Sequence, residues 1–207
     1  MHGRWVERHP GDIAVKCGRH ICLDESSALQ LAREAGVPTP RMHKAERTAD
    51  GVCRIHMDFV PGQTLDKVWP ELSLEQKADV VRQLREILTA MRAQKPPAQT
   101  LIGTCSGGEV HDLRVYSHYT AGPFEDEEAF NKGTVLDLLP GTPMVLREAF
   151  ARRLRTDHRL TFIHADIAQH NIMIHGGRIT ALLDWEYAGW FPEYWEYVKF
   201  FERPCQH

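Results

Sequence analysis

Residues Phe162 to Trp190 read FIHADIAQHNIMIHGGRITALLDWEYAGW, and this stretch decides the fold. It contains two short apolar runs, at 172–174 and 179–183, which are separated by the turn signal Gly176-Gly177. Two such runs around a Gly-Gly pair are typical of two antiparallel strands joined by a tight turn. The sequence therefore predicts a β-hairpin in this region.

Polar residues stand at both open ends of the predicted hairpin. Asn171 comes directly before the first strand, and Asp184 comes directly after the second. Because the two ends of a hairpin lie side by side, we expect their side-chain oxygens to converge with Asp166 on one small volume. Oxygen ligands of this kind suit Mg²⁺, which proteins bind through one or two carboxylates together with substrate phosphates. The stretch thus predicts a metal-assisted phosphate site.

The order of these residues resembles a known catalytic segment. The pattern H-x-D-x-x-x-x-N at 164–171, followed by D-W-E at 184–186, resembles that of the aminoglycoside phosphotransferase and choline kinase family, which has a protein-kinase-like fold. The resemblance implies that Asp166 is the catalytic base and that Asn171 and Asp184 hold Mg²⁺ across the phosphates of ATP.

Two details refine this resemblance. His164 is expected to be a structural member of the catalytic loop, and Ala165 stands where many family members have glycine. The downstream segment 185–197 resembles fungal members of the family in particular.

The N-terminal part contains a candidate phosphate-binding lysine. Residues 12–18, DIAVKCG, alternate in polarity and predict a short strand with Lys16 near its end. In the family resemblance this lysine contacts the phosphates of ATP. The alternative is an edge-strand lysine that keeps the protein soluble.

Glu25 is the expected partner of that lysine. A helix is predicted from Asp24, its N-cap, to a stop at Gly36. One explanation for Glu25 in the first turn is that the helix dipole favours an acidic residue there. The order of the motifs favours an ion pair with Lys16 that aims the ammonium at the phosphates.

A candidate adenine-binding segment follows. Residues 52–59 predict a strand, and the segment 55–65, IHMDFVPGQTL, resembles the family's hinge between two lobes. The resemblance implies that Met57 lines the adenine pocket and that the backbone of Asp58 and Val60 bonds the adenine edge. A plain strand and turn is the alternative.

The rest of the chain is predicted to be largely helical. A capping box at 73–76 opens a long helix that ends at Arg92, and residues 143–154 predict another helix. Residues 102–124 are expected to form a loop. The acidic run 125–128 suits the first turn of a helix or, alternatively, an acidic collar for a cationic substrate.

Composition excludes several classes of protein. The 207 residues are 43% hydrophobic and 26% charged, which is ordinary for a globular protein. The net charge of -3 gives no basic field to attract nucleic acid. No run approaches the roughly 20 apolar residues of a membrane helix. The polar N-terminus does not resemble a signal peptide, and the 5 cysteines suggest neither zinc nor disulfides, so we expect a cytoplasmic protein.

These patterns together predict an α+β, protein-kinase-like two-lobe fold. Residues 1–60 would form a reduced N-terminal lobe, and 61–207 a mainly helical lobe with the catalytic hairpin. The predicted function is ATP- and Mg-dependent transfer of phosphate to a hydroxyl of a small molecule. No glycine-rich loop precedes Lys16, and little chain follows Asp184. Two alternatives therefore stay open, an inactive pseudokinase-type binding module and a nucleotide-independent reaction. The acceptor and the oligomeric state are not predicted.

Overall fold

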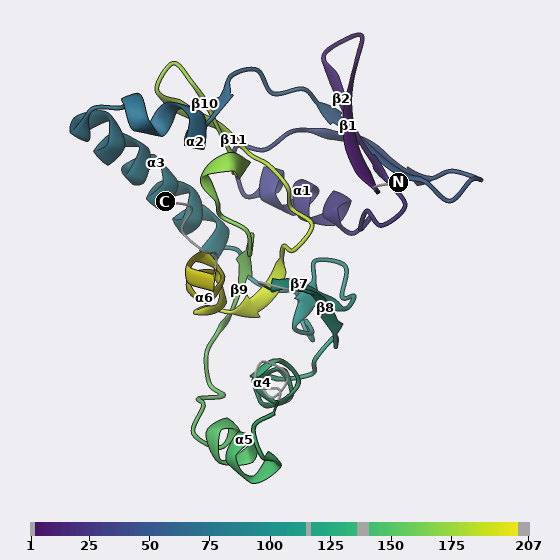
Figure 1. Cartoon of the computed structure of the whole chain (residues 1–207), viewed down its shortest axis with the longest axis vertical. Coiled ribbons are helices and arrows are strands. Elements are labelled where there is room, and N and C mark those ends of the chain that lie inside the picture. The colour runs from purple at the N-terminus through teal and green to yellow at the C-terminus, as the bar shows by residue number, and fades with distance from the viewer. Residues whose placement is uncertain (1–2, 115–116, 136–140, 203–207) are drawn as a thin grey trace.

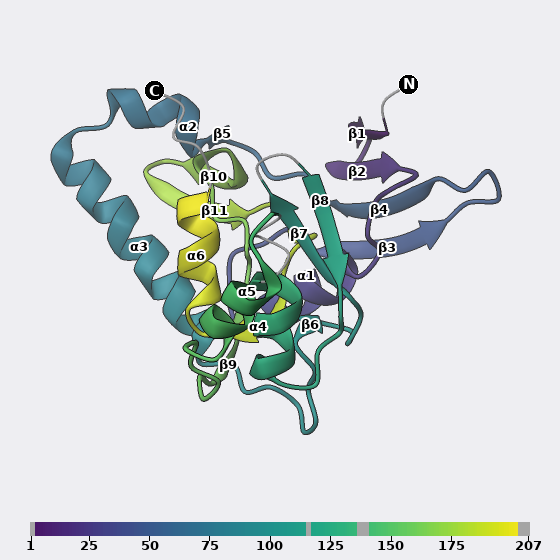
Figure 2. The ribbon, with the colours of Figure 1, turned by 60° about the horizontal axis from the view of Figure 1, so that its bottom comes forward.

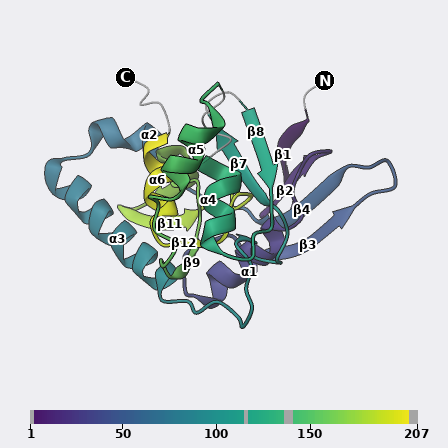
Figure 3. The same ribbon diagram turned by 90° about the horizontal axis from the view of Figure 1, so that it is seen from below.

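The computed structural model describes residues 3–114, 117–135 and 141–202, which form helices and strands in a mixed arrangement (Figure 1). An N-terminal sheet lies on one side of the molecule and a long helix on the other (Figures 1 and 3). When the molecule is turned, three further helices, within residues 127–202, lie in front, between the long helix and the N-terminal sheet (Figure 2).

The N-terminal sheet has four antiparallel strands in the order β1-β2-β4-β3. Their bounds are β1 Arg4–His9, β2 Ile13–Gly18, β3 Met42–Arg47 and β4 Cys53–Asp58. The strands that the sequence predicted around Lys16 and Met57 are confirmed as β2 and β4. No strand was predicted where β1 lies, because its six residues are all exposed and show no buried face. Backbone pairing with β2 along its whole length defines β1 instead.

The predicted first helix is confirmed as α1, Glu25–Glu34. Its buried face, with Ala28, Leu29 and Ala32, belongs to the same core cluster as Ile55 of β4. Gly36 has a φ of +75°, as a helix stop in the left-handed region requires. Asp24 occupies the N-cap position, but its side chain makes no capping hydrogen bond.

The long helix is α3, Leu74–Arg92, and it begins with the predicted capping box of Ser73 and Gln76. Before it come β5 Gln63–Thr64, α2 Leu65–Val68 and the 3-10 turn Trp69–Glu71. The buried Gln83 side chain of α3 accepts a hydrogen bond from the Ile179 N–H at 2.9 Å and donates to the Gly177 carbonyl at 3.0 Å. Helix α3 therefore holds the turn and second strand of the hairpin.

The predicted hairpin is confirmed. Strand β10, Ile172–His175, pairs antiparallel with β11, Arg178–Leu182, and with the short β5. A second three-stranded sheet has the order β6-β12-β9, and two of its strands come before and after the hairpin in the sequence. Its strands are β6 Gly103–Thr104, β9 Leu160–Ile163 and β12 Gly189–Pro192. A Cβ on Gly189 would come within 2.0 Å of the Gly103 carbonyl oxygen, so only glycine fits in β12 at this point.

The prediction of a loop at 102–124 is wrong. This segment contains β6 and a further hairpin of β7, Val110–Arg114, and β8, Ser117–Ala121. The turn signals Gly107-Gly108 and Gly122-Pro123 lie on either side of this hairpin. They mark the limits of two strands and not a continuous loop.

Three more helices complete the fold: α4 Glu127–Val135, α5 Met144–Ala151 and α6 Trp195–Glu202. The acidic run therefore does include the first turn of a helix, and the helix predicted at 143–154 is confirmed. Among the tryptophans and tyrosines of the segment 185–197, Trp185, Tyr187, Trp190 and Trp195 are buried in the core. Tyr197 on α6 is 69% exposed.

None of the helices in the described part of the chain combines the length and apolar character that a membrane crossing requires. The division into lobes at residues 60 and 61 stays a prediction. Strand β4 ends just before that point at Asp58, and β5, which pairs with β10, begins just after it at Gln63.

Candidate active site

The site is centred on the ammonium of Lys16, which β2 presents from the N-terminal sheet. Lys16 Nζ donates to Glu25 Oε2 at 2.6 Å and to Asp184 Oδ1 at 2.7 Å. The predicted Lys16–Glu25 pair is therefore present in the structure. Through its second bond, to Asp184, Lys16 joins β2 and α1 to the end of the C-terminal hairpin, 168 residues further along the chain.

Burial and charge act in opposite directions on this cluster. Burial lowers the pKa of Lys16, but the carboxylates of Glu25, Asp184 and Glu186 outweigh it and hold that pKa above its usual value. Burial also raises the pKa of Glu25 to about 7, against the opposing effect of Lys16. The ammonium is thus firmly charged, as a group that neutralises phosphate must be.

The hairpin positions both candidate metal ligands. The Leu183 N–H donates to the Asn171 carbonyl at 2.8 Å, which ties the two feet of the hairpin together. Asp184 follows with a φ of +62°, a left-handed conformation that turns the chain away from β11. Asn171 and Asp184 consequently line the same cavity.

The donor atoms of this pair fit a hard cation. Asn171 Nδ2 donates to Asp166 Oδ2 at 2.8 Å, so its amide oxygen is oriented away from that contact. Asp184 uses Oδ1 for Lys16, and Oδ2 has no hydrogen-bond donor among the described residues. One amide oxygen and one carboxylate oxygen are ligands that Mg²⁺ accepts, with phosphates completing its shell.

Asp166 lies in a buried loop between β9 and the 3-10 turn Gln169–Asn171. It is linked to Asn171 through both its carboxylate and its carbonyl oxygen, the latter at 3.1 Å. His164, fully buried, accepts from the Asp166 N–H at 3.2 Å through Nδ1 and contacts the Leu183 carbonyl at 2.9 Å through Nε2. As expected, His164 connects the loop to the hairpin.

The sequence did not predict the residue that binds the backbone of this loop. The Glu196 carboxylate, on α6, accepts hydrogen bonds from the N–H groups of His164 at 2.8 Å and Ala165 at 2.9 Å. Ala165 has a φ of +61°, so the backbone is constrained where the clamp acts. Removal from water raises the pKa of Glu196 to about 7, although the two amides oppose the rise. No local signal points to this contact, which spans more than thirty residues.

A cavity of about 470 Å³ extends from this cluster to the C-terminal end of β4. Met57, Asp58 and Val60 all line it, together with Lys16 and Asp184. The Asp58 N–H donates to the Arg41 carbonyl at 2.9 Å, which leaves its own carbonyl as the group that could meet an adenine edge. Among the described residues, the Val60 N–H donates to no acceptor. Val6 of β1 adds an apolar wall that the sequence did not predict.

A second contact that the sequence did not reveal lies beside Lys16. Arg4 Nη1 donates to both carboxylate oxygens of Glu186, at 2.5 and 2.6 Å. Glu186 Oε2 is also 3.8 Å from Lys16 Nζ. The buried Glu186 carboxylate therefore faces two cations, one on β1 and one on β2.

Several solved structures resemble this fold. A thermostable mutant of aminoglycoside phosphotransferase APH(4)-Ia in its apo form matches with a TM-score of 0.59 and 16% identity, over 92% of this chain and 64% of that chain. Its ternary complex with ADP and hygromycin B matches with a TM-score of 0.62 and 14% identity, over 96% and 71%. The streptomycin–ATP–APH(2")-IIa ternary complex matches with a TM-score of 0.60 and 11% identity, over 96% and 67%. The chain thus spans 64% of the length of the first of these structures.

The fold is therefore that of the protein-kinase-like phosphotransferases, an α+β architecture. A family model described as "Phosphotransferase enzyme family" matches residues 20–203. This match covers most of the sequence, and the chain belongs to that family. No curated protein sequence matches it significantly.

Proposed function

We propose that this protein transfers the γ-phosphate of ATP to a hydroxyl group of a small molecule with the help of Mg²⁺. The observation that carries the proposal is the ion-pair cluster of Lys16, Glu25 and Asp184 at one end of the 470 Å³ cavity. A buried lysine held between two carboxylates at the mouth of a cavity suits a charged phosphate chain. The nucleotides named in the matched structures, ADP and ATP, support this choice.

The nucleotide would lie along the cavity. Its adenine would contact Met57, the Asp58 carbonyl and the Val60 N–H, at the opposite end from Lys16. Its phosphates would meet the ammonium of Lys16, which Glu25 orients at 2.6 Å. Asn171 and Asp184 would hold Mg²⁺, which neutralises charge on the phosphates.

Asp166 would act as the catalytic base. In the transfer, the acceptor hydroxyl gives its proton to the Asp166 carboxylate as its oxygen bonds to the γ-phosphorus. The bond between that phosphorus and the β–γ bridging oxygen breaks, and ADP leaves with the electron pair. The loop that carries Asp166 is held by Asn171 and Glu196, so the base is positioned before the acceptor arrives.

Calorimetry with a non-hydrolysable ATP analogue, with and without Mg²⁺, tests the proposal. We expect binding that depends on Mg²⁺ and is lost in Asp184→Ala. Asp157→Ala is the matched control, since this aspartate is 71% exposed and pairs only with the neighbouring Arg155 in the described chain. No binding by the wild type, or equal binding by both variants, would contradict the proposal and favour a non-catalytic role or a reaction without nucleotide.

A further inference from the structure

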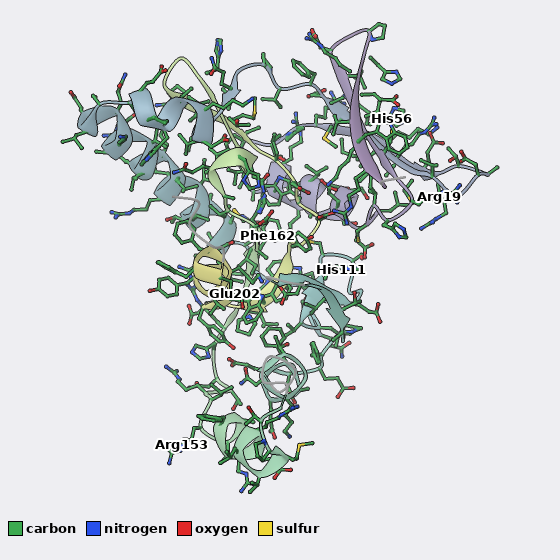
Figure 4. All side chains as sticks on the ribbon, in the orientation of Figure 1. Arg19, His56, His111, Arg153, Phe162 and Glu202 are labelled. Atoms are coloured by element: carbon green, nitrogen blue, oxygen red, sulfur yellow. The ribbon has the colours of Figure 1, made fainter. Side chains whose placement is uncertain are left out.

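A second cavity, of about 790 Å³, lies next to the nucleotide cavity. Its wall includes residues 19–24 before α1, the end of the N-terminal sheet, and the β7–β8 hairpin. Figure 4 labels Arg19 on the sheet side and His111 on the hairpin side, and both residues belong to the wall. None of the residues that would bind the nucleotide or Mg²⁺ lines this cavity.

Three arginines reach the second cavity because of the register of the sheet. Arg4 pairs with Gly18, Gly18 with Cys53, and Cys53 with Arg47, so one row crosses all four strands. Arg4 and Arg47 stand at the two ends of this row, and Arg19 follows directly after β2. The sheet therefore gathers three guanidinium groups at one of its ends.

The acidic residues of the same wall bond to groups other than Arg19 and Arg47. Glu186 is bound by Arg4, and the buried Asp112 is bound by Lys199 at 2.5 Å. Asp24 accepts a hydrogen bond from the Thr104 hydroxyl at 3.1 Å. Arg19 and Arg47, in contrast, pair with no carboxylate among the residues that the structure describes. Lys199 is shared with Glu202, and the three arginines of the wall match its three carboxylates in number. The positive charge is therefore local, at Arg19 and Arg47.

The second cavity is joined to the first by ion pairs. Glu186 binds Arg4 on the wall of the second cavity and lies 3.8 Å from Lys16, which lines the nucleotide cavity. A ligand in the second cavity would therefore lie beside the phosphate end of the nucleotide. An acceptor must also lie beside that end for its hydroxyl to meet a γ-phosphate.

We propose that the second cavity binds the acceptor of the reaction, and that this acceptor is a hydroxylated small molecule with a carboxylate or phosphate group. The inference rests on the proposed function, because it takes phosphate transfer as given and names the substrate class. Arg19 and Arg47 recognise the anionic group, since guanidinium groups form strong, often bidentate hydrogen bonds with both kinds of anion. An amine-rich acceptor is disfavoured there, because like charges would meet.

The test compares molecules that share hydroxyl groups but differ in charge. Calorimetry without nucleotide is carried out with gluconate, glucose and glucosamine, and with glycerol 3-phosphate and glycerol. We expect the anions to bind at least about tenfold more tightly than their uncharged counterparts, and glucosamine to bind most weakly. Preference for gluconate or for glycerol 3-phosphate identifies the anionic group as carboxylate or phosphate.

Matched variants locate the binding site. Arg47→Gln and Arg19→Gln should each weaken binding of the preferred anion by about tenfold. Arg178→Gln, an equally exposed arginine on β11 outside the cavity, should leave it unchanged. Equal binding of charged and uncharged molecules, or equal losses in all three variants, would overturn the inference. Because no nucleotide is present, either result is independent of the ATP-binding test of the proposed function.

Discussion

Substitution of Glu196 by glutamine tests whether the carboxylate that binds the backbone of the catalytic loop titrates with a raised pKa. Glu196 accepts two backbone N–H groups, from His164 and Ala165. Glutamine has nearly the same shape but a single acceptor oxygen, so one N–H loses its partner. It also has no proton to release, and the pH dependence of stability should therefore change.

The magnitude follows from the pKa of this carboxyl group. Removal from water raises the pKa of Glu196 from 4.5 to about 7, with His164 and Ala165 amides and Arg92 opposing. Between these values the folded chain holds a proton that the unfolded chain has released. Stability falls with rising pH wherever the folded state binds more protons. Between about pH 5 and about pH 8, the wild type should lose about 2 kcal/mol that the Glu196→Gln variant does not lose.

Urea unfolding at the two pH values measures this difference. Tryptophan fluorescence reports the transition, because Trp185, Trp190 and Trp195 are all buried. The free energy of unfolding of the variant should gain on that of the wild type as pH rises. Glu86→Gln, at an exposed position of α3, is the control and should show the wild-type pH dependence. A difference between Glu196→Gln and wild type that is the same at both pH values would refute the reasoning.

Three further substitutions have expected results. Asp166→Asn should lower phosphate transfer by about 100-fold or more while ATP binding, measured by calorimetry, stays close to that of wild type; equal turnover would remove Asp166 from the chemistry. Lys16→Met should weaken ATP binding and lower the free energy of unfolding by about 3–5 kcal/mol, because the buried Glu25 loses its cation; an unchanged unfolding midpoint would contradict this. Gly189→Ala should destabilise the fold by more than about 2 kcal/mol, since its Cβ would meet the Gly103 carbonyl, whereas Gly3→Ala, with no atom closer than 3.7 Å, should not.

Local patterns in the sequence were enough to predict the elements that carry the site. The two apolar runs around Gly176-Gly177 fold as the expected hairpin, and the capping box at 73–76 opens the expected helix. Lys16 and Glu25 are separated by only nine residues, so a strand and a helix in succession bring them together. In each case the deciding interactions lie within one or two elements.

Contacts between distant segments could not be predicted in this way. Arg4 and Glu186 are 182 residues apart, and nothing in either segment indicates the other. Glu196 looks like an ordinary glutamate in the first turn of a helix until α6 is placed beneath the catalytic loop. Strand β1 was missed for a related reason, because pairing with β2 and not a buried face defines it. The Lys16–Asp184 contact, which joins residues 168 positions apart, was likewise not predicted.

The hairpin of β10 and β11 has a closed end at its turn and an open end where the chain enters and leaves it. The open end carries Asn171 and Asp184, and the hydrogen bond from Leu183 to Asn171 fixes its width. The closed end, at Gly176 and Gly177, is exposed, although the Gly177 carbonyl accepts a hydrogen bond from Gln83 of α3. A Cβ on Gly176 would meet open space, so a fluorescent label there should leave both that contact and the spacing at the other end unchanged. The turn is therefore a suitable position for a label that reports nucleotide binding without disturbing the binding site.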